Sequence, residues 1–241
     1  MIATPGPVGS PSIVDFKWEG RGISLRFPSA DDHVAKIVRQ TKAFYEMEML
    51  LDVRSRLFFG SCAVDVGAHV GNHSVFFALA LGMRTIAFEP NPDSFALLEE
   101  NVAANGLGDM CELHEVGVGR HGGKARLVLD ETGRNSSAAR LEDDDTGEVE
   151  IVTLDESLRG APQVDVIKID VEGWENRVLQ GGSETIARHR PILYVETWES
   201  NFAPVREVLG AMRYVCWKRF NYTPTFLFLP EERFRASTVA G

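Results

Sequence analysis

A chain of 241 residues with 44% hydrophobic and 25% charged residues has the size and composition of one large globular domain, alone or with a small extension. Its formal net charge of −10 argues against broad contact with a phosphate backbone, so we expect no nucleic acid partner. The longest apolar run, residues 74–83, is about half the length needed to cross a bilayer, which predicts no membrane insertion.

The first residues, 1–12, read MIATPGPVGSPS and predict a disordered lead-in because they combine proline, glycine and serine. They lack the basic and apolar segments of a secretory signal. The three cysteines, Cys62, Cys111 and Cys216, are far apart and odd in number, which is typical of reduced thiols rather than of a disulfide framework or a zinc site. We therefore expect a cytoplasmic protein.

Residues 13–60 are predicted to form an N-terminal extension. The segment DFKWEGRGISLRFP, residues 15–28, has two alternating runs joined near two glycines and predicts a β-hairpin. Residues 31–58 carry apolar side chains at helical spacing and predict one or two amphipathic helices. These helices are expected either to form a lid over a pocket or to make a homodimer contact, and the sequence does not rank the two roles.

Residues 61–230 alternate between strand and helix patterns and are predicted to form the main domain, followed by a tail at 231–241. The core strands are expected at residues 62–66, 84–89, 110–118, 164–173 and 191–197. The helices between them are expected at residues 72–81, 93–106, 174–189 and 205–212. An antiparallel pair is expected from residues 124–130 and 147–154, and a closing hairpin from residues 213–220 and 223–230. This order indicates an α/β fold with a mostly parallel sheet, whose ligands bind at the carboxyl ends of the strands.

The segment DVGAHVG, residues 65–71, joins the first core strand to a helix and is shaped to receive a ligand. No Gly-Lys-Ser/Thr follows it, which excludes a P-loop. The dinucleotide fingerprint needs a second glycine where this chain has His69, and the methyl group of Ala68 also crowds a pyrophosphate. A nicotinamide-dependent oxidoreductase therefore stays only as a weaker alternative.

Glu89 favours S-adenosylmethionine as the ligand of this turn. It ends the second core strand, where a carboxylate can accept two hydrogen bonds from a ribose diol and would repel a 2′-phosphate. The aminocarboxylate end of the cofactor could then be held by Asp65, Asn72 and Ser74, at the strand end and the helix start.

Several side chains are candidates for the chemistry. Lys168 and Asp170 share one face of a strand, so Asp170 either fixes the cofactor or binds a metal while Lys168 sets its charge, or the two form a structural ion pair. Glu172 and Glu196 end neighbouring strands, and each is a candidate base or metal ligand. His73 has the intrinsic pKa of a general base.

Three further features have plain structural interpretations beside the functional ones. His69 and His73 are one helical turn apart, but no third zinc ligand follows them. The acidic residues 142–150 lack the spacing of a calcium loop and predict a solvated turn. Phe220, Tyr222 and Phe226 are expected either to wall an acceptor site or to pack in the core of the closing hairpin.

Three segments together resemble the FkbM family of S-adenosylmethionine-dependent methyltransferases. They are VDVGAHVGNHSVFFA, AFEPNPDSFALLEENVAANGL and VDVIKIDVEGWENRVLQGG, at residues 64–78, 87–107 and 164–182. The resemblance extends over residues 44–197. It implies a class I methyltransferase fold: a Rossmann-like, mostly parallel sheet of seven strands with a C-terminal antiparallel hairpin. It also implies transfer of a methyl group to a hydroxyl of a sugar, glycan precursor or secondary metabolite, with S-adenosylhomocysteine as the product.

The resemblance assigns residues to the cofactor and to the chemistry. The positions that match the family's cofactor site are Gly67, Ala68, His69, Gly71, Asn72, His73 and Ser74 in the turn and helix start, Glu89 with Pro90 and Asn91 at the ribose, and Val116 with Gly117 beside the adenine. Asn135, Ser136 and Ser137 match a polar loop near the active site, and Asp170, Glu172 and Gly173 match the signature strand end. No metal ligands are assigned, metal dependence is left open, and a module that binds the cofactor without catalysis is the second alternative.

Overall fold

The computed structural model describes residues 11–58, 60–129 and 139–233. The lead-in up to residue 10, the predicted polar loop with Ser136, and the tail from residue 234 lie outside the described residues. The strands are β1 (Ser12–Trp18), β2 (Arg21–Phe27), β3 (Cys62–Val66), β4 (Arg84–Phe88), β5 (Cys111–His114), β6 (Gly117–Val118), β7 (Gly123–Val128), β8 (Arg140–Asp143), β9 (Val149–Val152), β10 (Val166–Ile169), β11 (Ile192–Glu196), β12 (Tyr214–Phe220) and β13 (Thr225–Pro230). The helices are α1 (His33–Thr41), α2 (Met47–Arg56), α3 (Asn72–Leu81), α4 (Pro92–Ala104), α5 (Leu154–Ser157), α6 (Glu175–Gly181), α7 (Ser183–His189) and α8 (Glu199–Ala211).

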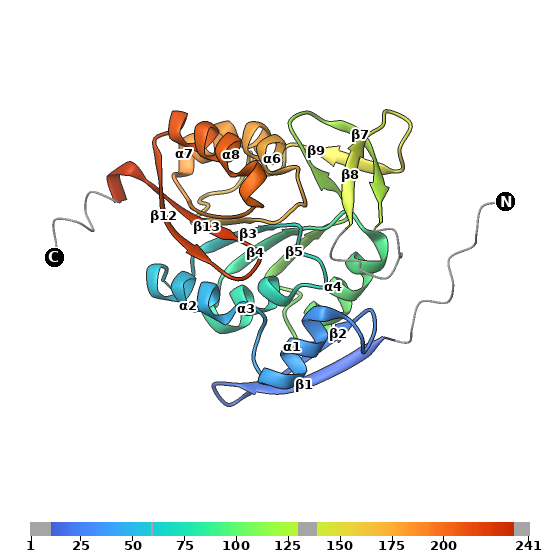
Figure 1. Ribbon diagram of the computed structural model, residues 1–241. Coiled ribbons are helices and arrows are strands. Elements are labelled where there is room, and N and C mark those ends of the chain that lie inside the picture. The colour runs from blue at the N-terminus through green and yellow to red at the C-terminus, as the bar shows by residue number, and fades with distance from the viewer. Residues whose placement is uncertain (1–10, 59, 130–138, 234–241) are drawn as a thin grey trace.

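Seven strands form the central sheet in the order β12-β13-β11-β10-β3-β4-β5 (Figure 1). The five strands from β11 to β5 are parallel to one another, and β13 runs antiparallel to both of its neighbours. This arrangement confirms the predicted α/β fold with a mostly parallel seven-stranded sheet and a C-terminal antiparallel hairpin.

The two faces of the sheet form two separate hydrophobic cores, because side chains alternate along each buried strand. Ala63 and Val166 pack into one core with residues of α3, α4 and the N-terminal hairpin. Val64 and Ile167 pack into the other core with residues of α6, α7 and α8. Asp65 and Lys168 therefore lie on the first face, where their charges need partners within the protein.

The predicted third strand and the long helix after the fourth strand were wrong in part. Residues 110–118 split into β5 of the central sheet and β6 of a second sheet, ordered β6-β9-β7-β8. The helix expected at 174–189 is divided into α6 and α7 at Gly182. The antiparallel pair of β7 and β9 is confirmed, but the first residues of the acidic segment extend the sheet as β8 instead of forming a turn.

The N-terminal hairpin and helices share the core of the first face. Phe16 and Phe27 are buried with Phe76 of α3, and Phe44 contacts Phe16 at 5.1 Å between ring centroids. Hydrogen bonds to Asn101 of α4 fix the hairpin: the Arg26 N–H donates to Asn101 Oδ1 at 2.6 Å, and Asn101 Nδ2 donates to the Arg26 and Val70 carbonyls at 2.9 and 2.8 Å. Within the residues described, there is no helix that is both long enough and apolar enough to pass through a bilayer.

The Asn101 side chain is fully buried, so its removal should leave buried polar backbone groups of Arg26 and Val70 unpaired. We predict that Asn101→Ala lowers the free energy of unfolding by about 2–4 kcal/mol, the expected cost of orphaning two or three buried groups. Urea denaturation measures this loss. Glu99→Ala, on the exposed side of the same helix, should change it by less than about 0.5 kcal/mol. Equal stability of the two variants would contradict the role of Asn101.

Candidate active site

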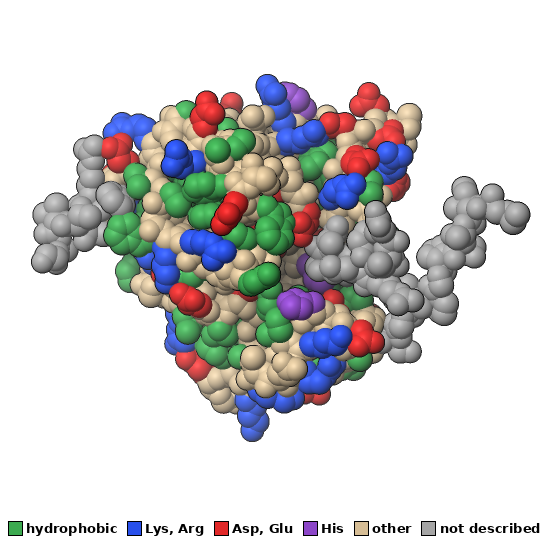
Figure 2. Space-filling model, in the orientation of Figure 1, with side chains coloured by type: hydrophobic (Ala, Val, Ile, Leu, Met, Phe, Trp, Pro, Cys, Tyr) green, Lys and Arg blue, Asp and Glu red, His purple; other side chains and the backbone are tan. Residues whose placement is uncertain are grey.

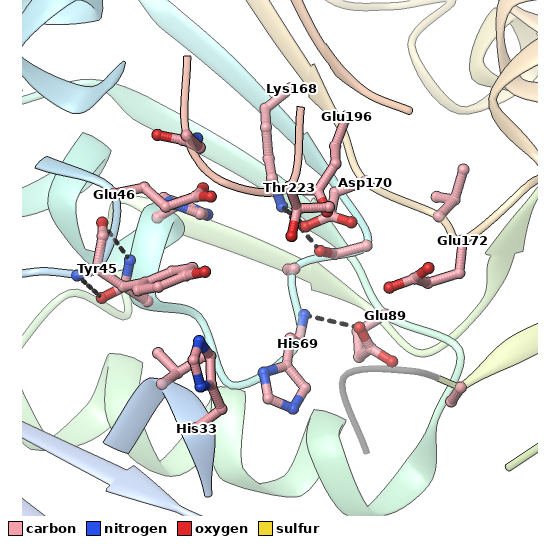
Figure 3. A pocket seen from close by; sticks show the side chains of 18 of the residues that line it. His33, Tyr45, Glu46, His69, Glu89, Lys168, Asp170, Glu172, Glu196 and Thr223 are labelled. Carbon is pink, nitrogen blue, oxygen red and sulfur yellow. Dashed lines mark hydrogen bonds and ion pairs between the residues drawn. The ribbon is translucent and has the colours of Figure 1, made fainter. Parts of the chain in front are cut away.

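A cavity of about 810 Å³ opens at the carboxyl ends of the central strands. Its polar lining includes His33, Tyr45, Glu46, His69, Asn72, His73, Glu89, Lys168, Asp170, Glu172, Glu196 and Thr223. Figure 2 shows the hollowed part of this face, where histidine side chains lie beside hydrophobic ones. Figure 3 shows the polar side chains that project into the cavity from both sides. This position is where ligands bind in open parallel sheets.

The glycine turn after β3 lies against the two neighbouring strands. The N–H groups of Gly67 and Ala68 both donate to the Phe88 carbonyl, at 2.9 and 3.0 Å. Gly67 has φ +75°, and a Cβ atom there would lie 1.7 Å from the Asp170 carbonyl oxygen. Only glycine fits this contact, so Gly67 is required by the close packing of the turn on the end of β10.

Glu89 faces the cavity with both carboxylate oxygens positioned by backbone donors. The N–H of His69 donates to Oε2 at 2.7 Å, and the N–H of Asn91 donates to Oε1 at 2.9 Å. Burial raises the pKa of Glu89 to about 7, although these two hydrogen bonds oppose the shift. Pro90 also lines the cavity, whereas the buried Asn91 begins α4 by accepting a hydrogen bond from Asp93 N–H at 3.1 Å.

Lys168 is the centre of a buried charge network. Its ammonium lies 3.3 Å from Asp65 Oδ1 and 3.2 Å from Asp170 Oδ2, and it donates a hydrogen bond to the Gly67 carbonyl at 3.1 Å. Burial alone would lower the pKa of Lys168, but the charges of Asp65 and Asp170 outweigh this effect and hold it above its usual value. The predicted ion pair is therefore present, and it also fixes the glycine turn.

The structure places Asp65 and Ser74 behind the cavity wall. Both side chains are fully buried, and the Ser74 hydroxyl donates to Asp65 Oδ2 at 2.6 Å. Asn72 does line the cavity, but its side chain exchanges two hydrogen bonds with the backbone of Tyr45, at 3.0 and 3.3 Å. Asp65 and Ser74 thus shape the site through Lys168 and the start of α3, and Asn72 does so through the backbone of Tyr45. A direct contact of Asp65 or Ser74 with a ligand would require these buried hydrogen bonds and ion pairs to break.

The loop before α2 supplies a wall that the sequence pattern did not reveal. Tyr45 and Glu46 line the cavity with His33, Val34 and Ile37 of α1. Helix α1 of the extension therefore borders the pocket, whereas no residue of α2 lines it. The lid role and the homodimer contact both stay predictions. Tyr45 and Glu46 belong to no recognisable sequence motif. A tertiary contact with Asn72 holds them at the strand ends, and a sequence pattern does not reveal such a contact.

His73 and Glu46 form a buried pair at this wall. His73 Nε2 lies 3.2 Å from Glu46 Oε2, and both side chains are less than 10% exposed. His69 is half-buried, and desolvation lowers its pKa. Glu46, His69 and Glu172 have φ of +59°, +51° and +46°, a region that costs residues other than glycine about 1–3 kcal/mol. Strained backbone of this kind is typical of functional sites.

Some predicted site residues lie elsewhere. Val116 and Gly117 are not among the residues that line the cavity, because Gly117 pairs with Ile151 in the second sheet. Gly71 is packed against Leu98, where a Cβ atom would lie 2.5 Å from Cδ1. In the closing hairpin, Phe220 and Phe226 are buried in the hydrophobic core, which is the packing alternative expected from the sequence. Tyr222 lies at the cavity mouth with 92% of its surface exposed.

A model of the methyltransferase FkbM domain matches residues 65–222 of this chain. Methyltransferase sdnD of Sordaria araneosa is 27% identical over 181 residues, which cover 61% of this chain and 70% of that protein. The hexuronic acid methyltransferase AglP of Haloferax volcanii is 29% identical over 119 residues, 48% of each chain, so the match spans about half of that relative.

Solved structures share the fold. The methyltransferase FkbM of Methylobacillus flagellatus KT superposes with a TM-score of 0.55 at 18% identity, over 78% of this chain and 49% of that one. The N-terminal domain of human METTL16 superposes with a TM-score of 0.50 at 15% identity, over 77% of this chain and 68% of that one.

The Lys168 network predicts a strong coupling between two buried charges. Lys168→Met should lower the free energy of unfolding by about 3–5 kcal/mol, because it leaves Asp65 buried without its cation. The double variant Lys168→Met/Asp65→Leu should lose less than the single variant, as measured by urea denaturation. Lys36→Met, which removes a half-exposed ion pair with Asp31, serves as the control and should lose at most about 1 kcal/mol. A double variant that loses as much stability as Lys168→Met alone, or more, would exclude the coupling.

Proposed function

Because the chain belongs to the FkbM methyltransferase family, we propose that it transfers the methyl group of S-adenosylmethionine to a hydroxyl oxygen of a sugar, a glycan precursor or a secondary metabolite. Family membership rests on the domain match over residues 65–222, which is more than half of the chain.

The arrangement of Glu89 carries the proposal. Its two oxygens each accept one backbone hydrogen bond and keep lone pairs directed to the cavity, which suits a ribose diol that donates two hydrogen bonds. The adjacent turn has Ala68 and His69 where a dinucleotide site needs space for a pyrophosphate. S-adenosylmethionine has a ribose and no phosphate, so it fits both features.

The methionine part of the cofactor would extend from Glu89 along the glycine turn toward Asp170. Asp170 lies at the end of β10, where its carboxylate is shared with Lys168 but remains partly accessible, with 28% of its side chain exposed. A partly neutralised carboxylate is suited to the amino group or sulfonium of the cofactor, both of which are positive. Asp65 and Ser74 support this position indirectly through Lys168 and the start of α3.

Methyl transfer is an in-line displacement, so the acceptor oxygen must lie opposite the sulfur across the methyl carbon. Holding two reactants in such a geometry contributes roughly 7–11 kcal/mol to lowering the barrier. The part of the cavity between Tyr45, Glu46 and Glu196 is left for the acceptor. The acceptor hydroxyl must also lose its proton, and His73 beside Glu46, or Glu172 with a pKa raised to about 7, is suited to receive it.

The cavity mouth favours a ring-shaped polar acceptor. Trp198 and Tyr222 lie there with 51% and 92% of their surfaces exposed, and flat aromatic faces stack well on sugar rings. The hexuronic acid methyltransferase among the relatives supports a sugar as the acceptor class.

The cofactor assignment is tested by calorimetric titration of S-adenosylhomocysteine. The wild-type chain should bind with micromolar Kd, and Glu89→Ala should weaken binding more than about tenfold, or about 1.4 kcal/mol, because two charge-assisted hydrogen bonds are lost. Glu99→Ala is the control and should bind as the wild type does. No binding by the wild type would overturn the proposal. Binding without methylation of any acceptor, whether a sugar, a glycan precursor or a secondary metabolite, would instead support a cofactor-binding module without catalysis.

The pKa of Glu89 predicts a pH dependence of cofactor affinity. Hydrogen bonds from the ribose diol favour the ionised carboxylate, so binding should lower the pKa of Glu89 from about 7 and release a proton. The affinity for S-adenosylhomocysteine should therefore increase as the pH rises from 6 to 8. Titrations in buffers of different ionisation enthalpy measure the released proton. Glu89→Gln, which does not titrate, should remove this part of the pH dependence, and an unchanged profile would exclude Glu89 as its source.

A further inference from the structure

Three carboxyl groups converge at the ends of two neighbouring parallel strands. Asp170 follows β10, Glu172 comes two residues later, and Glu196 is the last residue of β11, which pairs with β10. One oxygen atom of each carboxyl group lies within 4.8 Å of the other two. Figure 3 shows these side chains turned toward the same part of the cavity.

Among the residues that the structure describes, the basic side chains at the cavity do not balance the negative charge of these three acids. Of the residues described, Lys168 is the only lysine or arginine that lines the cavity. Its ammonium is already shared between Asp65, Asp170 and the Gly67 carbonyl. Glu172 and Glu196 make no ion pair with a described residue. A divalent cation bound between the three acids would supply the positive charge that the lining residues do not provide.

A fourth carboxyl group, from a different part of the chain, independently points to a ligand in the same cavity. Glu46 has a side chain only 4% exposed, and its Oε1 atom has no hydrogen-bond partner among the described residues. Its other oxygen lies beside His73 Nε2. The side chain lines the same cavity as the three acids. Buried polar atoms of this kind are normally satisfied by water or by a bound group.

We propose that Asp170, Glu172 and Glu196 bind one divalent cation of the Mg²⁺ or Mn²⁺ type, with Glu46 accepting a hydrogen bond from a water molecule in the cation's shell. Three carboxylates without a thiolate or an imidazole form a donor set for hard cations and not for zinc. Mg²⁺ and Mn²⁺ keep several water ligands when bound by a few carboxylates, which leaves positions for a hydroxylated acceptor.

The role of the cation, but not its binding, rests on the proposed methyl transfer. A bound cation lowers the pKa of a coordinated hydroxyl group, as it does that of water. With Glu172 bound to the cation, the hydroxyl proton passes to His73, and the oxygen forms a bond to the methyl carbon. At the same time the carbon–sulfur bond breaks, and the sulfur keeps the electron pair as it becomes the neutral thioether of S-adenosylhomocysteine.

Titration of Mn²⁺ into the full chain, without cofactor or acceptor, tests the site by calorimetry and by electron paramagnetic resonance of free Mn²⁺. The wild type should bind one Mn²⁺ per chain, and its Tm should rise with Mn²⁺. Glu172→Gln and Glu196→Gln should each bind at least tenfold more weakly. Glu199→Gln removes an exposed carboxylate three residues from Glu196 and should bind as the wild type does. Glutamine keeps the size and removes one repelling charge, so the cation-free Tm of both site variants should equal or exceed that of the wild type.

The proposal is wrong if the wild type takes up no Mn²⁺ below millimolar concentration, or if both site variants bind it as tightly as the wild type. Parallel titration of S-adenosylhomocysteine separates this result from the proposed function. Cofactor binding without Mn²⁺ uptake overturns the cation site alone. Uptake of Mn²⁺ without cofactor binding overturns the proposed function and leaves the cation site in place.

Discussion

The buried contact between Lys168 and Asp65 determines how the candidate site is assembled. Parallel pairing of β3 and β10 places these residues side by side in register, on a face of the sheet where neither charge can reach water. The same ammonium also bonds to the Gly67 carbonyl and to Asp170, while Asp65 accepts a hydrogen bond from Ser74 at the start of α3. The Lys168 ammonium group thus links two strands, the glycine turn and the carboxylate of Asp170 at the cavity. Because desolvation makes each charge costly without the other, the network favours a single arrangement.

The parts of this site that the sequence predicts are those set by local rules. Side-chain alternation predicts that Lys168 and Asp170 share a face, and the end of a parallel strand predicts that Glu89, Asp170 and Glu196 face a ligand. Glycine spacing predicts the turn. The structure explains the requirement, because Gly67 lies against the Asp170 carbonyl, where no Cβ atom fits. Each of these inferences needs only the strand pattern and the common direction of the strands.

Contacts between distant segments explain what the sequence does not predict. Glu46 reaches the cavity because Asn72 binds the backbone of Tyr45, and Asn101 positions the hairpin by bonding to Arg26 and Val70. The predicted strand 110–118 divides because its second half pairs with β9 and leaves the central sheet. The family resemblance placed Val116 and Gly117 beside the adenine. Gly117 pairs with Ile151 in the second sheet, and neither residue lines the cavity. No periodicity within one segment encodes such pairings.

Glu89 and the glycine turn are together proposed to form a site for S-adenosylmethionine at the end of the sheet. A crystal structure of the full chain with S-adenosylhomocysteine tests this claim most directly. We expect both ribose hydroxyls within hydrogen-bond distance of the Glu89 carboxylate, with the sulfur directed toward Asp170 and the space beside Glu196. A ribose bound elsewhere, or a ligand that leaves Glu89 without a contact, would contradict it.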